Sequence, residues 1–344
     1  MSKRVYAIVV LLLSLMLLTA CGSGSTANRE DAEPANGEPA ADRKIKVYTT
    51  LFVTTDFAQS IAGDKASVEN IVPAGVEPHD FEPTAKDMIK LNEADLFVYN
   101  GAGFEGWVEK ALQAIESKEI VVVDASKDIE LIRSEDGAHE GHGPDEHAGE
   151  EDQGHDEHAD EENHDNGEFD PHIWLDPLKA KKQAELIKEA LVQADPANET
   201  YYEDNFQALS HQVDELDSSY RDLVVNAKHK EIVVSHAAFG YLAHAYGLEQ
   251  IAISGISPSN EPSQKQLKDI IETVKAHEIE YILFDSLVSG KVAEVVKQEA
   301  GAEALTLHTL ENLTQEELAQ GKNYFSVMKD NLEVLKKALK ASEK

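Results

Sequence analysis

The chain alternates short β-branched runs with helical stretches, and it does so twice, which limits its fold more than any other feature of the sequence. Predicted strands cover residues 45–51, 68–72, 96–99 and 120–123, and then 232–234, 251–253, 281–284 and 304–307. Helical patterns such as 84–92 and 106–117 separate them. Strands that alternate with helices are typical of βαβ units, in which the strands lie parallel. The sequence therefore predicts an α/β fold with two lobes, each a mostly parallel sheet flanked by helices.

A long helix is predicted between the two sets of strands. Asp195 is a candidate N-cap, and Pro196 follows at the first helical position. Apolar side chains then recur four and three residues apart, at Tyr202, Phe206, Leu209, Val213, Leu216, Tyr220 and Leu223. A helix of about 30 residues is about 45 Å long, which exceeds one small domain. We expect residues 195–227 to join an N-terminal lobe, 44–194, to a C-terminal lobe, 228–344, as a rigid strut. An ordinary long surface helix would have the same pattern.

The N-terminus has the features of an export signal. Lys3 and Arg4 precede an apolar run over residues 5–18, which is too short for a transmembrane helix of about 20 residues. The run ends in Leu-Thr-Ala-Cys-Gly at 18–22, which resembles the lipobox of bacterial lipoproteins. We predict a signal peptide over 1–20, acylation of Cys21 and a flexible tether over 21–43, with a plain secretory signal as the alternative. The protein would then be lipid-anchored in the cell membrane and face outside the cytoplasm.

The charge balance excludes some classes of partner. The chain has 31 Lys and Arg against 65 Asp and Glu, which gives a net charge of −34. This excess argues against binding to nucleic acid, which requires cations that displace counterions, and against a polybasic attachment to anionic lipid. Because Cys21 is the only cysteine, the chain has no internal disulfide, thiolate metal cluster or CxxC redox centre.

Residues 134–168 form an acidic insert that is rich in histidine. The insert has fifteen Asp or Glu, no Lys or Arg, and six histidines, which are His139, His142, His147, His155, His158 and His164. With almost no apolar side chains it cannot pack, and we expect it to be disordered. A solvated acidic loop is the simplest interpretation, but solvation does not explain so many histidines. Short His-rich tracts are typical of metal binding, so we expect several weak metal sites here.

Four further residues are candidate metal ligands in the predicted lobes: His79, His172, His236 and Asp285. Three of them come just after a predicted strand, which is where ligands bind in open α/β sheets, and His172 directly follows the insert. The wide gaps between the four match no local zinc signature, and a single histidine is more often structural. The prolines before His79 and His172 would stiffen their loops and lower the entropic cost of holding an imidazole.

Several motifs resemble one known family. They are Pro-His-Asp-Phe-Glu-Pro at 78–83, Asp-Pro-His-Ile-Trp-Leu-Asp-Pro at 170–177, Ser-His-Ala-Ala-Phe-Gly-Tyr at 235–241, and Ile-Ser-Pro at 256–258 with Glu-Pro-Ser at 261–263. From residue 45 to its end the chain resembles the zinc-binding lipoproteins of bacterial metal-uptake ABC transporters, a branch of the cluster A-I solute-binding proteins. The insert also lies where zinc-binding members have theirs.

The resemblance implies one metal ion between two lobes, with His79, His172, His236 and Asp285 as its ligands. Three imidazoles and one carboxylate suit Zn²⁺, whereas manganese-binding members tend to have Glu at the third position. Many zinc-binding members have Glu or water at the fourth position, and Asp285 has a shorter reach. Trp174 and Phe239 are expected to line the site, and the remaining histidines outside the insert, His211, His229, His244, His277 and His308, are expected to be structural or on the surface.

The resemblance further implies a monomeric protein, not an enzyme, that delivers Zn²⁺ to an ABC transporter permease. A manganese or broad divalent-metal binder of the same family is the first alternative. An exported zinc hydrolase is the second, because catalytic zinc keeps an open position for water and loss of Asp285 as a ligand would leave one. The sequence contains no repeat or exposed aromatic module of the kind that would suggest a surface adhesin.

Overall fold

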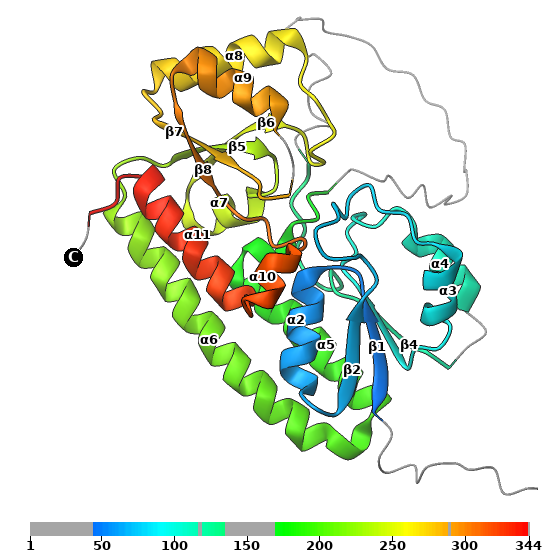
Figure 1. Ribbon diagram of the computed structural model, residues 1–344. Coiled ribbons are helices and arrows are strands. Elements are labelled where there is room, and N and C mark those ends of the chain that lie inside the picture. The colour runs from blue at the N-terminus through cyan, green and yellow to red at the C-terminus, as the bar shows by residue number, and fades with distance from the viewer. Residues whose placement is uncertain (1–43, 116–118, 135–168, 288–289, 343–344) are drawn as a thin grey trace, which may run out of the picture. The chain divides into compact units, whose positions relative to one another are not determined.

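The computed structural model describes residues 44–115, 119–134, 169–287 and 290–342. Within these residues lie two separate four-stranded sheets, and every strand pair in both is parallel (Figure 1). The predicted fold class is confirmed. None of the described helices is long and apolar enough to cross a membrane.

The first sheet has the strand order β2-β1-β3-β4, with β1 at Ile45–Thr49, β2 at Ala66–Asn70, β3 at Leu96–Tyr99 and β4 at Val121–Asp124. Alternate residues of a strand face opposite sides, so Leu96 and Val98 enter one core and Phe97 enters the other. On the first side pack α2 (Phe52–Ala62) and α5 (Pro177–Ala194), and on the second pack α3 (Ala85–Leu91) and α4 (Val108–Ile115). We call these elements the N-lobe.

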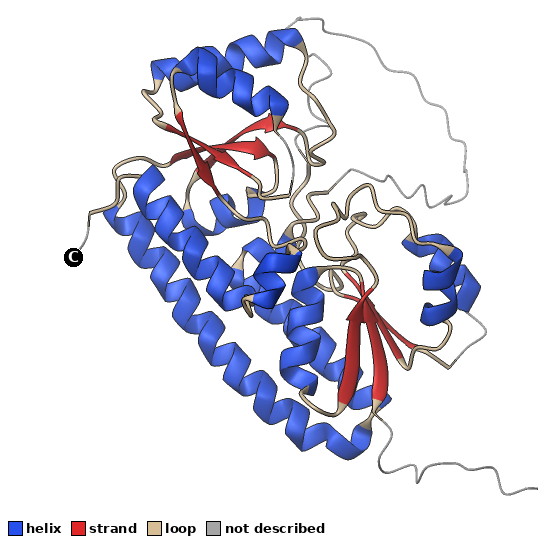
Figure 2. Ribbon diagram, viewed as in Figure 1, coloured by secondary structure: helices blue, strands red, loops and turns tan. Residues whose placement is uncertain are grey.

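The second sheet repeats this order as β6-β5-β7-β8, with β5 at Glu231–His236, β6 at Glu249–Ser254, β7 at Tyr281–Phe284 and β8 at Glu303–Thr306. Helices α8 (Gln264–Ala276) and α9 (Lys291–Ala300) cover one face through Val274, Ala293 and Val296. The other face packs on α7 (Gly240–Tyr246) and belongs to the same core as Leu96 and Val98, which we call the main core. Helices thus lie on both sides of this sheet (Figure 2). We call this sheet and its three helices the C-lobe.

Helix α6 (Glu199–Asn226) runs along both lobes, packing on α2 and α5 toward its start and on α11 (Tyr324–Ala338) toward its end (Figure 1). All seven side chains of the predicted apolar stripe are buried, so the helix has one continuous apolar face. It begins at Glu199 rather than at Pro196, because Pro196–Asn198 form a short 3-10 turn after Asp195. The predicted domain boundaries remain predictions.

The chain after β8 returns to the N-lobe. Residues 307–313, which we call the return segment, lead to the short helix α10 (Gln315–Ala319) and then to α11. The Tyr324 amide at the start of α11 donates to Asp56 of α2 at 3.0 Å, and the Tyr324 hydroxyl donates to the Trp174 carbonyl at 2.9 Å. The C-terminal part of the chain therefore connects both lobes.

Candidate metal centre

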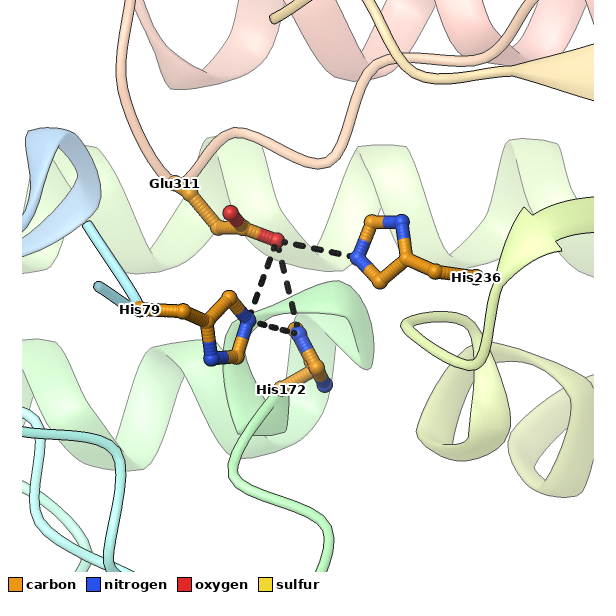
Figure 3. A group of neighbouring side chains, drawn as sticks. All are labelled: His79, His172, His236 and Glu311. Atoms are coloured by element: carbon orange, nitrogen blue, oxygen red, sulfur yellow. Dashed lines mark hydrogen bonds and ion pairs between the residues drawn. The ribbon is translucent and has the colours of Figure 1, made fainter. Parts of the chain in front are cut away.

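Four side chains from distant parts of the sequence converge at one point: His79, His172, His236 and Glu311 (Figure 3). One donor atom from each lies within 4.8 Å of the others. The Nε2 atoms of His79 and His172 are 3.2 Å apart, and Glu311 Oε1 lies 3.4 Å from Nε2 of both His172 and His236. Donors about 2.05 Å from a tetrahedral zinc ion are roughly 3.3 Å from one another. These three distances are close to that value, and His79 Nε2 lies 3.8 Å from Glu311 Oε1, so small side-chain adjustments would complete a four-coordinate site.

His79 is positioned by the loop that follows β2. Its backbone amide donates to Glu77 Oε1 at 2.7 Å, and its ring packs on Phe104 with a centroid distance of 4.3 Å. The side chain is only 7% exposed. Burial, together with the neighbouring imidazoles, lowers the pKa of His79 to about 3, although the Glu311 carboxylate opposes this shift. The ring is therefore neutral at physiological pH, which is the form that binds metal.

His172 is held by Asp170, two residues before it. Asp170 Oδ1 accepts from the His172 backbone amide at 2.9 Å and lies 2.8 Å from the ring Nδ1. A carboxylate on Nδ1 orients the ring and leaves Nε2 free for a metal, as is usual for a metal-binding histidine. Burial disfavours the charged ring, but Asp170 and Glu311 outweigh it and raise the pKa of His172 to about 9. Zinc must therefore displace a proton from this ring.

A buried polar network supports the backbone next to His172. Asn100 Nδ2 donates to the Pro171 carbonyl at 2.9 Å, and the Asn100 backbone amide donates to Glu105 Oε1 at 2.7 Å. Glu105 also accepts from the Thr50 hydroxyl at 2.5 Å. Burial raises the pKa of Glu105 to about 7, even though these hydrogen bonds favour its charged form. Residues that follow β1 and β3 thus fix the position of a loop far along the chain.

His236 ends β5, the strand that lies between β6 and β7 where the strand order reverses. Ligands bind at this position in open α/β sheets. The side chain is 1% exposed, and its Nε2 faces Glu311 (Figure 3). The end of β5 thus brings His236 to the same point as the other three donors, and its role as a ligand stays a prediction.

Asp285, the predicted fourth ligand, lies outside the group of four. Its Oδ2 is 3.8 Å from Nδ1 of His236, on the side of the ring that faces away from Glu311. Its carboxylate instead accepts from the Leu287 amide at 2.8 Å and from the Thr309 hydroxyl at 3.3 Å. These bonds and the short side chain keep Asp285 behind His236, and in the structure Glu311 rather than Asp285 joins the three imidazoles, so the choice of carboxylate ligand stays a prediction.

The return segment brings Glu311 to the group. Although this segment follows a C-lobe strand, the Glu311 carbonyl accepts from the Phe52 amide at 2.9 Å. Asn312 Nδ2 donates to the carbonyls of Pro73 at 2.7 Å and Val76 at 2.9 Å, in the loop that leads to His79. Glu311 follows the predicted strand 304–307 as the other candidates follow theirs, but no motif surrounds it, and this weak signal alone does not single it out.

The chemistry of this group fits a metal ion better than a set of hydrogen bonds. His236 Nε2 and both carboxylate oxygens of Glu311 are buried and make no hydrogen bond. Burial alone would raise the pKa of Glu311, but the imidazoles of His172, His236 and His79 hold this pKa well below its usual range. A buried carboxylate that stays ionised without hydrogen bonds needs a nearby cation, which in the metal-free protein is the protonated His172 ring 3.4 Å away and which a bound metal ion would replace. Three imidazole nitrogens and one carboxylate oxygen are a donor set typical of Zn²⁺.

Comparison with known proteins places the chain in a family. Residues 47–338 match the family described as ZnuA, the periplasmic component A of the zinc-uptake complex. The chain belongs to this family. The resemblance seen in its motifs is thereby confirmed.

Two curated relatives and one solved structure illustrate this ZnuA-family match. The high-affinity zinc uptake system protein ZnuA of Bacillus subtilis is 38% identical over 339 residues, covering 98% of this chain and 99% of the relative. The zinc-binding lipoprotein AdcA of Streptococcus pneumoniae is 37% identical over 327 residues, covering 94% of this chain but only 60% of AdcA. The Zn(II)-bound ZnuA-like domain of that AdcA superposes with a TM-score of 0.70 at 36% identity, covering 86% of this chain and 99% of the domain.

The remaining predicted site residues divide into two groups. Cys21 and the six histidines of the insert lie outside the described residues. Trp174 is fully buried, and its ring lies 5.4 Å from that of His172, so it lines the site as expected. Phe239 is buried in the main core of the ZnuA-family fold. Of the other histidines, His308 is buried beside Glu317 and His277 pairs with Glu231 on the surface.

Proposed function

We propose that this ZnuA-family protein captures Zn²⁺ outside the cytoplasm and delivers it to an ABC transporter permease for import. The observation that carries the proposal is the buried group of His79, His172, His236 and Glu311, whose donor atoms all lie within 4.8 Å of one another. Within it, His236 Nε2 and both Glu311 oxygens make no hydrogen bond. The names of the relatives support zinc as the ion. Glu311 takes the fourth position in this proposal, in place of Asp285.

The donor set also separates zinc from the alternatives. Mn²⁺ prefers oxygen donors, and this site has one carboxylate against three imidazoles. A zinc hydrolase needs an open position on its metal for water, whereas four protein donors converge here. We therefore favour a binding protein over an enzyme.

Metal analysis of the purified protein, followed by a competition titration of Zn²⁺ against Mn²⁺, tests this function. We expect one tightly bound zinc ion per chain and a clear preference for zinc. A protein that bound manganese as tightly as zinc would favour the broad divalent-metal alternative. Hydrolysis of ester or peptide substrates by the zinc form would favour the enzyme.

We also propose that Cys21 carries the lipid that holds the protein at the outer face of the cell membrane. The lipobox-like sequence at 18–22 supports this proposal, and diacylglycerol supplies the two chains that stable anchoring needs. A Cys21→Ala variant should be released from the membrane fraction into the soluble fraction. Retention of that variant in the membrane would argue against a lipid anchor. We further propose that the protein works as a monomer.

A further inference from the structure

The residue before Glu311 has a backbone conformation that its side chain disfavours. Leu310 has φ +61°, in the left-handed region, where a residue with a β-carbon is uncommon. Its side chain is fully buried, so it cannot relax without leaving the core. Because Leu310 immediately precedes Glu311, its left-handed backbone sets the direction in which the Glu311 side chain points.

His308 holds this turn. Its ring Nδ1 accepts a hydrogen bond from the Leu310 backbone amide at 2.8 Å. An Nδ1 that accepts carries no proton, so the ring proton is on Nε2, which lies 3.5 Å from Glu317 Oε1. Asn331 of α11 fixes the backbone of His308, because its Oδ1 accepts from the His308 amide at 2.8 Å and its Nδ2 donates to the His308 carbonyl at 2.7 Å.

The Leu310 amide lies outside any helix or strand, so no backbone carbonyl of a helix or sheet accepts its hydrogen bond, and the His308 ring does so instead. Leu310 is buried, and a buried amide without an acceptor is strongly disfavoured. Without this acceptor the return segment would have to rearrange, and Glu311 would move away from the three imidazoles. His308 itself is not a member of the group of four.

We propose that His308 is a positioning residue of the metal site, which uses Nδ1 to keep Leu310 left-handed and so aims Glu311 at the ion. The proposal rests on the proposed zinc-binding function. In this role the buried His308, 6% exposed, acts on Glu311 through the Leu310 backbone and does not contact the metal ligands themselves. A positioning contact of this kind typically changes metal affinity by about 10- to 100-fold.

Two substitutions separate the Nδ1 contact from simple packing. In His308→Asn the amide oxygen takes the place of Nδ1 and can still accept from Leu310, whereas in His308→Gln it lies one bond further out. The matched control is Glu317→Gln, which changes the group near Nε2 and leaves Nδ1 untouched. For each full-length variant we would measure the zinc affinity by competition and the visible spectrum of the Co²⁺ form, with Glu311→Gln as the reference for a lost ligand.

We expect His308→Gln to bind zinc about 10- to 100-fold more weakly and to give a Co²⁺ spectrum like that of Glu311→Gln. His308→Asn and Glu317→Gln should stay close to the unaltered protein in both respects. Zinc affinity of His308→Gln equal to that of the unaltered protein would overturn the proposal, and so would equal losses in His308→Asn and His308→Gln. Absence of tight zinc binding in the unaltered protein would instead overturn the proposed function.

Hydrogen exchange on the unaltered protein provides a second test, which stands even if His308→Gln does not fold. The Leu310 amide should be protected from exchange in the metal-free protein, because His308 binds it before any ion arrives. Fast exchange at Leu310 beside protected neighbours would overturn the proposal.

Discussion

Two carboxylates, Asp285 and Glu311, lie near the three imidazoles, and the length of their side chains decides which one completes the group of four. Asp285 sits at the end of a C-lobe strand, as its place in the sequence predicts, but its oxygens bond to Leu287 and Thr309. Glu311 comes from the opposite direction and has a longer side chain, which brings Oε1 to 3.4 Å from two imidazoles. Asp285 is therefore placed to support His236 from behind. Burial and the nearby Glu311 charge raise the pKa of Asp285.

Substitution of the two carboxylates should separate a ligand from a supporting residue. Glu311→Gln should weaken zinc binding by about 150- to 5000-fold, because removing one partner of a buried charged cluster costs about 3–5 kcal/mol. Asp285→Asn should cost only about 10-fold, as expected for a residue behind a ligand. Competition titrations on both variants would measure this. A larger loss for Asp285→Asn than for Glu311→Gln would restore Asp285 as the ligand.

The sequence could predict the three histidines but not the carboxylate. His79 and His172 follow prolines in distinctive motifs, and His236 directly follows a strand, so local signals marked all three. Glu311 has no such motif around it. Its position depends on hydrogen bonds to Phe52 and, through Asn312, to Pro73 and Val76, more than 200 residues earlier. Contacts across such a separation leave no periodic pattern in the sequence.

At the scale of elements, periodicity predicted the strands and the buried stripe of α6, because both depend on which side chains face a core. The start of α6 was three residues off, since the Asp195-Pro196 signal begins a 3-10 turn rather than the helix itself. The docking of the return segment and α11 on the N-lobe was not predicted. It depends on specific tertiary bonds, such as that between Asp56 and Tyr324.

The bond between α2 and α11 should make stability depend on pH. Burial raises the pKa of Asp56 to about 6, against 3.8 when unfolded, although the Tyr324 amide favours the charged form. The folded protein therefore holds this proton more tightly than the unfolded chain does. The stabilisation of the folded state by the protonated Asp56 is fully present below about pH 4 and is lost as the pH rises through about 6.

Asp56→Asn should remove this dependence, because the amide oxygen can still accept from Tyr324 but carries no charge. We expect the variant to be more stable than the unaltered protein by about 1–3 kcal/mol at pH 8, and by nearly nothing at pH 4. Urea unfolding of both metal-free proteins across this pH range would measure the difference. A stability difference that stayed constant with pH would contradict the assignment.

For the molecule as a whole, the four candidate ligands are unequally divided between the lobes. His79 and His172 belong to the N-lobe, and the backbone of Glu311 is bonded to it through Phe52. His236 alone is fixed to a C-lobe strand. A bound ion would therefore add one bond between the C-lobe and three donors held by the N-lobe, and it should stabilise the folded chain as a unit.

His236→Glu tests both this link and the choice of metal. A ligand present at a thousandfold excess over its dissociation constant stabilises the fold by about 4 kcal/mol, which corresponds to a rise in Tm on the order of 10 °C. Zinc should raise the Tm of the unaltered protein by about this amount and that of the variant much less. Manganese should raise the Tm of the variant more than that of the unaltered protein, because glutamate replaces a nitrogen donor with a hard oxygen. Equal zinc-induced shifts in the two proteins would exclude His236 as a ligand.

Deletion of the acidic insert should separate weak metal capture from the buried site. We expect a chain without residues 134–168 to lose several weak zinc sites and to keep one tight site, because none of the four converging residues lies in the insert. Calorimetric titration of both chains with zinc would show this. If the deletion abolished tight binding, the insert would be the primary site.

X-ray absorption at the zinc edge would identify the donor atoms that hold the ion. With one equivalent of zinc, the ion should occupy the buried group of His79, His172, His236 and Glu311. We expect four nitrogen or oxygen neighbours at about 2.0–2.1 Å, with the multiple-scattering signal of three imidazoles. A spectrum with six oxygen neighbours, or with fewer than three imidazoles, would contradict it.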